Sequence, residues 1–179
     1  MKNSVKIIIT VLVVIVAVVA VLAITNGNKS GAGVSVNSAA DLTALVDDIY
    51  AKVTVEMPSV MSQEIDLSDS DAVKMFTGLD SNSELEYVVV SEPMMSSQAY
   101  SLVLAKVKAG ADVNKIAKDM NENVDARKWI CVTAEKVYTT SSGDVICLVM
   151  SNEETAKNVY NSFKKIAKNV GQEYERAGE

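Results

Sequence analysis

An unbroken apolar run from Ile7 to Ile24 constrains this chain more than any other feature. The run is interrupted only by Thr10 and follows two basic residues, Lys2 and Lys6. At a rise of about 1.5 Å per residue, a helix of this length spans roughly 27 Å, which is close to the hydrocarbon thickness of a bilayer. We therefore expect residues 1–24 to form an N-terminal signal-anchor, a transmembrane helix through residues 7–24.

Basic residues predict the orientation of this segment. Lys2, Lys6 and the N-terminal amine precede it, whereas only Lys29 follows it closely. Because cytoplasmic flanks are enriched in Lys and Arg, we expect a single-pass protein of the cell membrane, with a cytoplasmic N-terminus and an extracellular C-terminal domain. The alternative is a secreted protein, cleaved near Ala23 at the small-residue end of the apolar run.

The chain beyond the predicted span is acidic. The sequence has 17 bases and 23 acids, and three of the bases but none of the acids lie before residue 30. The remaining 14 bases and 23 acids give a formal charge of −9. Nucleic acids and anionic headgroups attract basic surfaces, so we expect neither as a partner of this domain.

The sequence contains no histidine. This excludes Ser-His-Asp and Cys-His nucleophilic sites and histidine-based zinc sites. Cys131 and Cys147 are too few for a four-cysteine zinc site, and no glycine-rich phosphate loop is present. We expect no cofactor, and we expect the cysteines to be two small buried side chains, with a disulfide between them as the alternative.

Periodicity predicts one domain between a linker and a tail. Residues 25–38 are rich in Gly, Ser and Asn, which is typical of a flexible linker, residues 39–170 form the domain, and residues 171–179 form a frayed tail. Helical spacing of apolar residues predicts helices that begin at residue 39 and that cover 71–77, 112–126 and 151–170. Strands are predicted at 84–91 and 100–108, and a hairpin at 135–140 and 144–150.

This order of elements predicts the fold class. Strands that arrive in adjacent pairs between helices favour an antiparallel sheet. We expect an α+β fold in two layers, with about four strands and with helices packed mainly on one face of the sheet.

The layout resembles a known family. An aromatic-x-Gly-aliphatic-Asp stretch, Phe76 to Asp80, leads to the first strand, and a Gly-Asp hairpin later ends at Met150-Ser151. These features resemble small extracytoplasmic domains of Gram-positive bacteria that are catalogued as a domain of unknown function. The resemblance covers roughly residues 40–165 and implies an envelope location and an α+β fold, but no catalytic or binding residues. Members usually carry a lipoprotein signal, whereas this chain has no cysteine just after the apolar run.

Few residues offer candidate sites. An Asp-x-Ser-x-Ser pattern resembles a metal-ion-dependent adhesion site, but it lacks a preceding buried strand, and we expect it to cap a short helix. Its residues are Asp66, Ser68, Asp69, Ser70 and Asp71. Trp129, Met94 and Met95 are candidate partner contacts, because Trp dominates binding hot spots and Met adapts to varied surfaces.

Three functions are compatible with these patterns. We expect a membrane-anchored, non-catalytic interaction module at the cell envelope, with an envelope protein as partner. A domain that binds or senses a small ligand or a cation is the alternative. A hydrolase acting on the cell wall is the third, because glycosidases use paired carboxylates such as Glu84 and Glu86.

Overall fold

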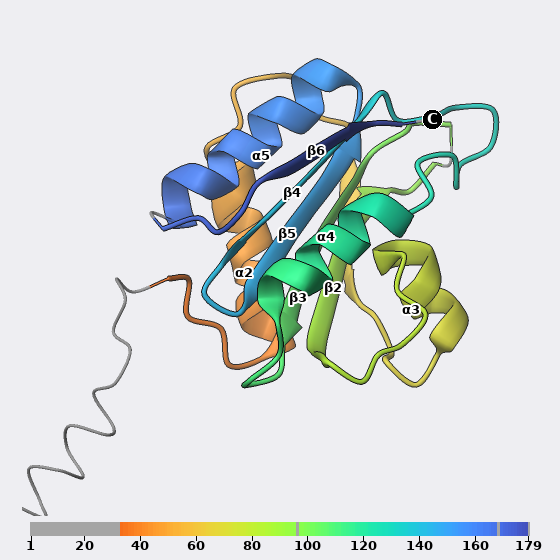
Figure 1. The fold of residues 1–179 in the computed structure, drawn as a ribbon. Helices are drawn as coiled ribbons and strands as arrows, with labels where there is room; N and C mark the ends of the chain where they lie inside the picture. The colour runs from red at the N-terminus through yellow and green to blue at the C-terminus, as the bar shows by residue number, and fades with distance from the viewer. Residues whose placement is uncertain (1–32, 96, 168, 179) are drawn as a thin grey trace, which may run out of the picture. The chain divides into compact units, whose positions relative to one another are not determined.

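One antiparallel sheet organises the fold (Figure 1). The computed structural model describes residues 33–95, 97–167 and 169–178, and within them the strand order is β1-β2-β3-β5-β4-β6. The predicted α+β class and antiparallel pairing are confirmed, but the expected number of about four strands was too low. The strands are β1 (Val60–Glu64), β2 (Leu85–Pro93), β3 (Ser101–Val107), β4 (Lys136–Ser142), β5 (Val145–Ser151) and β6 (Tyr174–Ala177).

Four helices in the described residues cover both faces of this sheet. Alternate β5 side chains divide between two cores: Cys147 packs with the core of α2 and α5, whereas Leu148 packs with the core of α3 and α4. The prediction of helices mainly on one face was therefore wrong, and the domain has three layers. The helices are α2 (Ala39–Tyr50), α3 (Ser70–Thr77), α4 (Val113–Asn123) and α5 (Glu153–Ala167).

The sequence of β5 explains the third layer. Residues 145–150 form a continuous apolar run, and every residue of β5 is buried. A strand that is buried on both faces has such a run, whereas a strand with one solvated face alternates apolar and polar residues. The central strand therefore needs helices on both sides of the sheet.

The two edge strands were not predicted from the sequence. β1 has a polar centre and pairs only with β2, and β6 pairs with β4 within the expected frayed tail at 171–179. Distant groups hold β6: the Tyr174 hydroxyl donates to Asn114 O over 3.0 Å, and Arg176 Nε donates to Asn121 O over 2.5 Å. The prediction of fraying was wrong because these partners lie 50 or more residues away in sequence.

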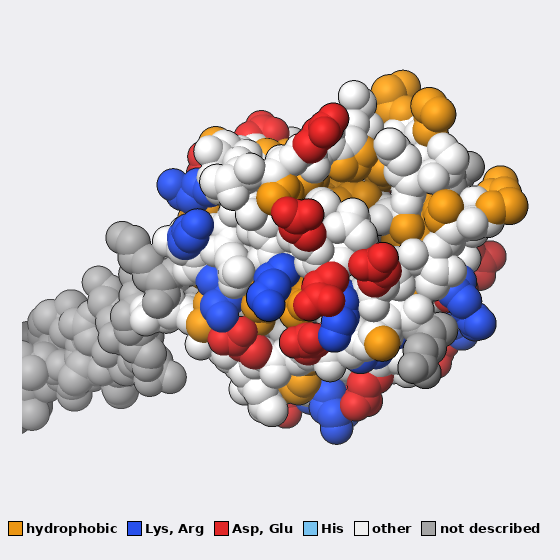
Figure 2. Space-filling view, turned by 90° about the horizontal axis from the view of Figure 1, so that it is seen from above, with side chains coloured by type: hydrophobic (Ala, Val, Ile, Leu, Met, Phe, Trp, Pro, Cys, Tyr) orange, Lys and Arg blue, Asp and Glu red, His pale blue; other side chains and the backbone are white. Residues whose placement is uncertain are grey.

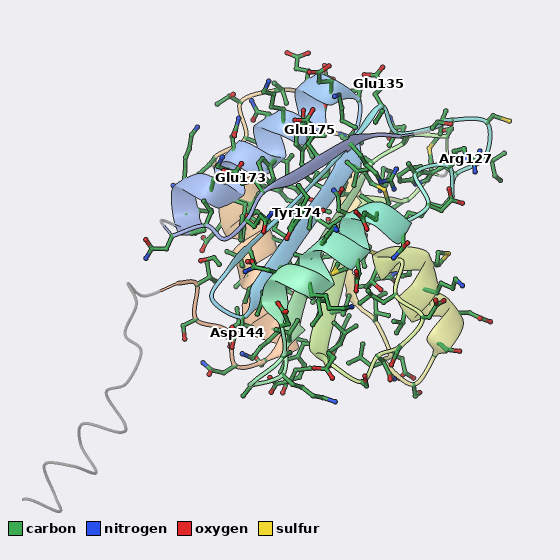
Figure 3. All side chains as sticks on the ribbon, viewed as in Figure 1. Arg127, Glu135, Asp144, Glu173, Tyr174 and Glu175 are labelled. Carbon is green, nitrogen blue, oxygen red and sulfur yellow. The ribbon has the colours of Figure 1, made fainter. Side chains whose placement is uncertain are left out.

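Glu173 links β6 to α5. Its carboxylate accepts a hydrogen bond from the Tyr160 hydroxyl over 2.8 Å and pairs with Lys164 Nζ at 2.7 Å. Figure 3 shows Glu173, Tyr174 and Glu175 in succession beside α5 and β4. Hydrogen bonds from Lys164 and Tyr160 lower the pKa of the Glu173 carboxyl below its usual value.

We expect Glu173→Gln to reduce the acid sensitivity of the fold. Because folding lowers the pKa of Glu173, its stabilising effect is fully present above the unfolded pKa of about 4.5 and is lost as pH falls through the folded pKa. Melting temperatures at pH 7 and pH 3.5 should therefore differ less in this variant than in the natural chain. Glu84→Gln, at an exposed position, is the matched control and should preserve the natural difference.

The packed unit begins at Gly33, before the expected domain boundary at residue 39. Val36 is buried among α2 and α5 side chains, and Val34 N–H donates to Ser142 Oγ over 3.3 Å. Residues 33–38 thus belong to the domain rather than to a free linker. They lie at the lower end of the sheet, where β4 ends at Ser142 and β5 begins at Val145.

The predicted span at residues 7–24 lies outside the described residues. Within the part of the chain that the structure describes, no helix is both long and apolar enough to cross a bilayer.

Candidate functional site

The upper end of the sheet gathers the residues of the candidate site. It is the end at which β2 finishes with Pro93, β3 begins with Ser101 and β5 finishes with Ser151. Seven residues of β5 separate it from the lower end, which corresponds to about 20 Å. Figure 2 looks down on the molecule from above and shows hydrophobic side chains gathered around a hollow.

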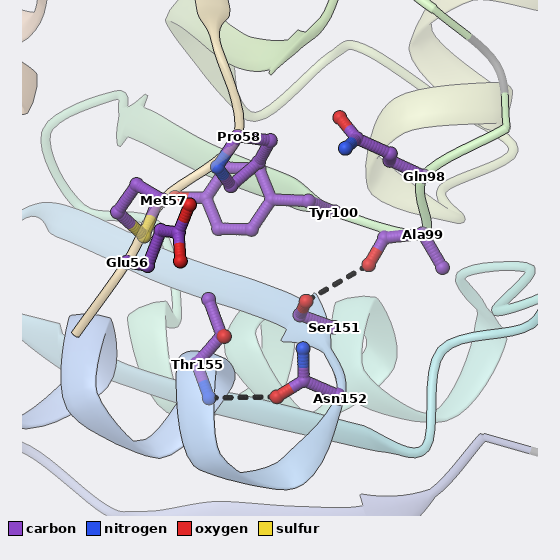
Figure 4. A pocket seen from close by; sticks show the side chains of 9 residues that line it. All are labelled: Glu56, Met57, Pro58, Gln98, Ala99, Tyr100, Ser151, Asn152 and Thr155. Carbon is purple, nitrogen blue, oxygen red and sulfur yellow. Dashed lines mark hydrogen bonds between the residues drawn. The ribbon is translucent and has the colours of Figure 1, made fainter.

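A cavity of about 370 Å³ opens at this end between three connections (Figure 4). The loop from α2 to β1 contributes Met57 and Pro58, and the loop from β2 to β3 leads to Tyr100. These three side chains form the apolar part of the lining. Residues at the beginning of α5 complete the cavity from the other side.

Buried hydrogen bonds fix the ring of Tyr100. Its hydroxyl lies 3.0 Å from the Tyr50 hydroxyl, which in turn donates to Ser91 Oγ over 2.8 Å. Burial raises the pKa of the Tyr100 hydroxyl well above its ordinary value, so the side chain stays neutral. The ring is therefore a rigid, uncharged wall rather than an acid or a base.

Amides and hydroxyls form the polar part of the lining. Asn152 Oδ1 accepts the Thr155 N–H over 2.9 Å and caps α5. The Asn152 amide nitrogen then points toward the cavity, and the amide of Gln98 lies across from it (Figure 4). The preceding residue, Ser151, donates to Ala99 O over 2.8 Å. Ser151 is the last residue of β5, and its hydrogen bond joins β5 to the loop from β2 to β3.

A buried ion pair lies beside this end of β2. Lys128 Nζ is 2.5 Å from Glu92 Oε1, and the Lys128 side chain is only 7% exposed. The ammonium also lies 4.5 Å from the centroid of the Phe76 ring and 5.4 Å from that of Trp129. Burial lowers the pKa of Lys128, because the charged ammonium loses hydration there.

Exposed apolar residues lie close in the chain to both partners of the ion pair. Met94 is 78% exposed, Met95 67% and Ile130 70%, and Met61 pairs in register with Glu92. Trp129 is half-buried against the core of α3 and α4. The structure thus brings together the three candidate contacts named from the sequence. We call this set the apolar patch: Met61, Met94, Met95, Trp129 and Ile130.

The Asp-Ser cluster stabilises a turn and a helix. Asp66 Oδ1 accepts the backbone N–H and the hydroxyl of Ser68, over 2.8 and 2.7 Å. Asp69 Oδ1 accepts the backbone N–H groups of Asp71 and Ala72 and caps α3, which begins at Ser70. Within the described ranges, no three His, Cys, Asp or Glu residues are grouped so that they could hold a metal ion.

The two cysteines lie in different surroundings and are not bridged. Cys147 is buried in the central strand, as expected, and burial raises the pKa of its thiol. Cys131 is exposed in the loop that follows Trp129, so the prediction that it is buried was wrong. Lys128 of this loop contacts Glu92 and Ser101 at the upper end of the sheet, whereas Cys147 pairs with Leu104 and Thr140 in the middle of the sheet.

Comparison with protein-family models, with curated proteins and with solved structures finds no match. Sequence reasoning missed Glu56, Gln98, Tyr100 and Asn152, which line the cavity. No local signal marks them, because three separate connections bring them together.

Proposed function

We propose that this chain is a non-catalytic interaction module of the cell envelope, which binds a protein partner through the upper end of its sheet. The apolar patch carries the proposal. Large exposed apolar patches are uncommon on monomers and mark interaction sites, and Met adapts its shape to varied partners. Here the exposed side chains of Met94, Met95 and Ile130 flank an ion pair and a half-buried Trp.

The position of Gly33 supports binding through the upper end of the sheet. Gly33 and Val34 lie beside the β4–β5 turn, at the end of the sheet opposite the apolar patch. The chain that precedes the domain, which includes the proposed anchor in residues 1–24, joins it at Gly33. In Figure 3, Asp144 marks the turn at the lower end of the sheet, and Glu135, near the beginning of α5, marks the upper end.

A small-ligand-binding or sensing domain is the second candidate. The cavity of about 370 Å³ favours it, since ligand pockets combine apolar walls with a few polar groups. The interaction module is preferred because the exposed side chains of the apolar patch lie outside the cavity lining.

Site-directed photo-crosslinking on intact cells of the native host tests the proposal. A photo-reactive amino acid in place of Met94 should capture one reproducible protein partner. The same amino acid in place of Ala109, an exposed residue after β3 at the lower end, is the control and should not capture that partner. Equal capture at both positions, or no specific adduct at Met94, would contradict the proposal.

Charge placed in the apolar patch should weaken binding. We expect the double variant Met94→Asp/Met95→Asp to reduce partner recovery by at least about tenfold, because about 1.4 kcal/mol of lost binding free energy corresponds to a factor of ten. Both positions are exposed, so the melting temperature should stay within about 2 °C of the natural value. Unchanged recovery from a folded double variant would exclude these side chains from the contact.

A further inference from the structure

The charges at the cavity restrict what can occupy it. Of the described residues that line it, Glu56 is the one with a formal charge, and it is exposed. Its side chain lines the cavity together with Met57 and Tyr100 (Figure 4). An anionic occupant would be repelled, whereas a cation would find an unoccupied carboxylate.

Further acids follow in the chain, at the beginning of α5. Glu153 and Glu154 follow the lining residue Asn152, and Glu153 N–H donates to Glu135 Oε2 over 2.9 Å. These acids, like the basic residues Lys52 and Lys157 on the flanking elements, lie outside the lining. The charge of Lys128 is compensated by Glu92. Glu56 is therefore the charge in the described lining that an occupant would meet, and it favours a positively charged group.

The neutral groups of the lining suit a peptide. Met57, Pro58 and the Tyr100 ring offer an apolar surface for one side chain. Gln98 and Asn152 carry amide groups that can donate to a carbonyl oxygen of a bound backbone and accept from its N–H groups. An apolar anchor with amide hydrogen bonds around it is the usual composition of a small recognition pocket.

We infer that the cavity receives an extended segment of the protein partner in which an apolar side chain is followed or preceded by Lys or Arg. The apolar side chain packs on Met57, Pro58 and Tyr100, and the cation pairs with Glu56. This inference rests on the proposed function and specifies the class of partner.

Peptide selection on the full-length protein tests the inference. A phage-displayed library of random linear dodecapeptides should yield sequences that contain an apolar residue next to Lys or Arg. The tightest such peptide, synthesised and titrated, should bind Glu56→Gln about fivefold more weakly than the natural chain, because an exposed ion pair contributes up to about 1 kcal/mol. Glu64→Gln removes the same charge from β1 outside the cavity and should change binding less than twofold.

The outcomes separate this inference from the proposed function. Enriched peptides without basic residues, an absence of enrichment, or equal effects of Glu56→Gln and Glu64→Gln would overturn the inference. Binding of free arginine amide as tight as that of the peptide would also overturn it, in favour of a small-ligand site. Failure of the proposed function would appear independently, as the loss of the specific adduct at Met94.

Discussion

Gly78→Ala is expected to lower the free energy of unfolding by about 3 kcal/mol or more. Gly78 ends α3 with a φ of 74°, a left-handed conformation that costs a residue with a Cβ atom about 1–2 kcal/mol. A Cβ at this position would also lie 2.3 Å from Val124 N, just after α4. Backbone atoms cannot move aside cheaply, so α3 and the end of α4 must separate. Urea denaturation with far-UV circular dichroism measures this change.

Gly110→Ala is the matched control for this experiment. Gly110 also has a positive φ, of 88°, but a Cβ there would meet no atom within 4 Å. This variant should therefore lose only the conformational term, about 1–2 kcal/mol. If both variants lose the same free energy of unfolding, the close approach of Gly78 to Val124 does not affect stability. A larger loss for Gly78→Ala would show that the close approach of Gly78 to Val124 adds to the conformational cost.

Lys128→Met is the second substitution with a large expected effect. It removes the ammonium but keeps a long apolar stem, and it leaves Glu92 beside the core without its cation. Breaking a buried ion pair by removing one partner typically costs about 3–5 kcal/mol, and the partial exposure of Glu92 places the expectation near the lower value. Chemical denaturation should show the loss at pH 7.

The double variant Lys128→Met/Glu92→Leu separates charge from packing. Replacing both partners by apolar residues is often neutral, so the double variant should recover most of the stability lost by Lys128→Met alone. If it recovers none, the cost of the single variant comes from lost packing on Phe76 and Trp129 rather than from an unpaired Glu92. The Lys128 ammonium lies over both rings.

The two halves of the candidate site differ in how far the sequence revealed them. Trp129, Met94 and Met95 could be named beforehand, because their side-chain chemistry alone marks them as contact residues. Glu56, Gln98 and Asn152 could not, because each is an ordinary loop or cap residue. Gln98 precedes β3 and Asn152 follows β5, which pair antiparallel, and Glu56 precedes β1, which begins beside the end of β2.

The edge strands show the same limit for the fold. The central strands can be predicted from β-branched and apolar runs, such as Val88 to Val90, whereas β1 and β6 are short and polar. An edge strand has a neighbouring strand on one side only. Its own sequence carries little information about that pairing. β6 is fixed by Asn121 and Asn114, which belong to α4.

The sequence by itself determined the local elements, because their signals act over a few residues. Ser38, Asp69 and Asp112 cap helices through hydrogen bonds to residues two or three positions later, and Gly78 and Gly143 supply the positive φ that ends a helix and closes a hairpin. Only the tertiary structure decided that helices cover both faces, that the tail adds a strand, and that a cavity and an apolar patch share one end of the sheet. These features depend on burial and pairing between residues far apart in the chain, where a local pattern has no physical influence.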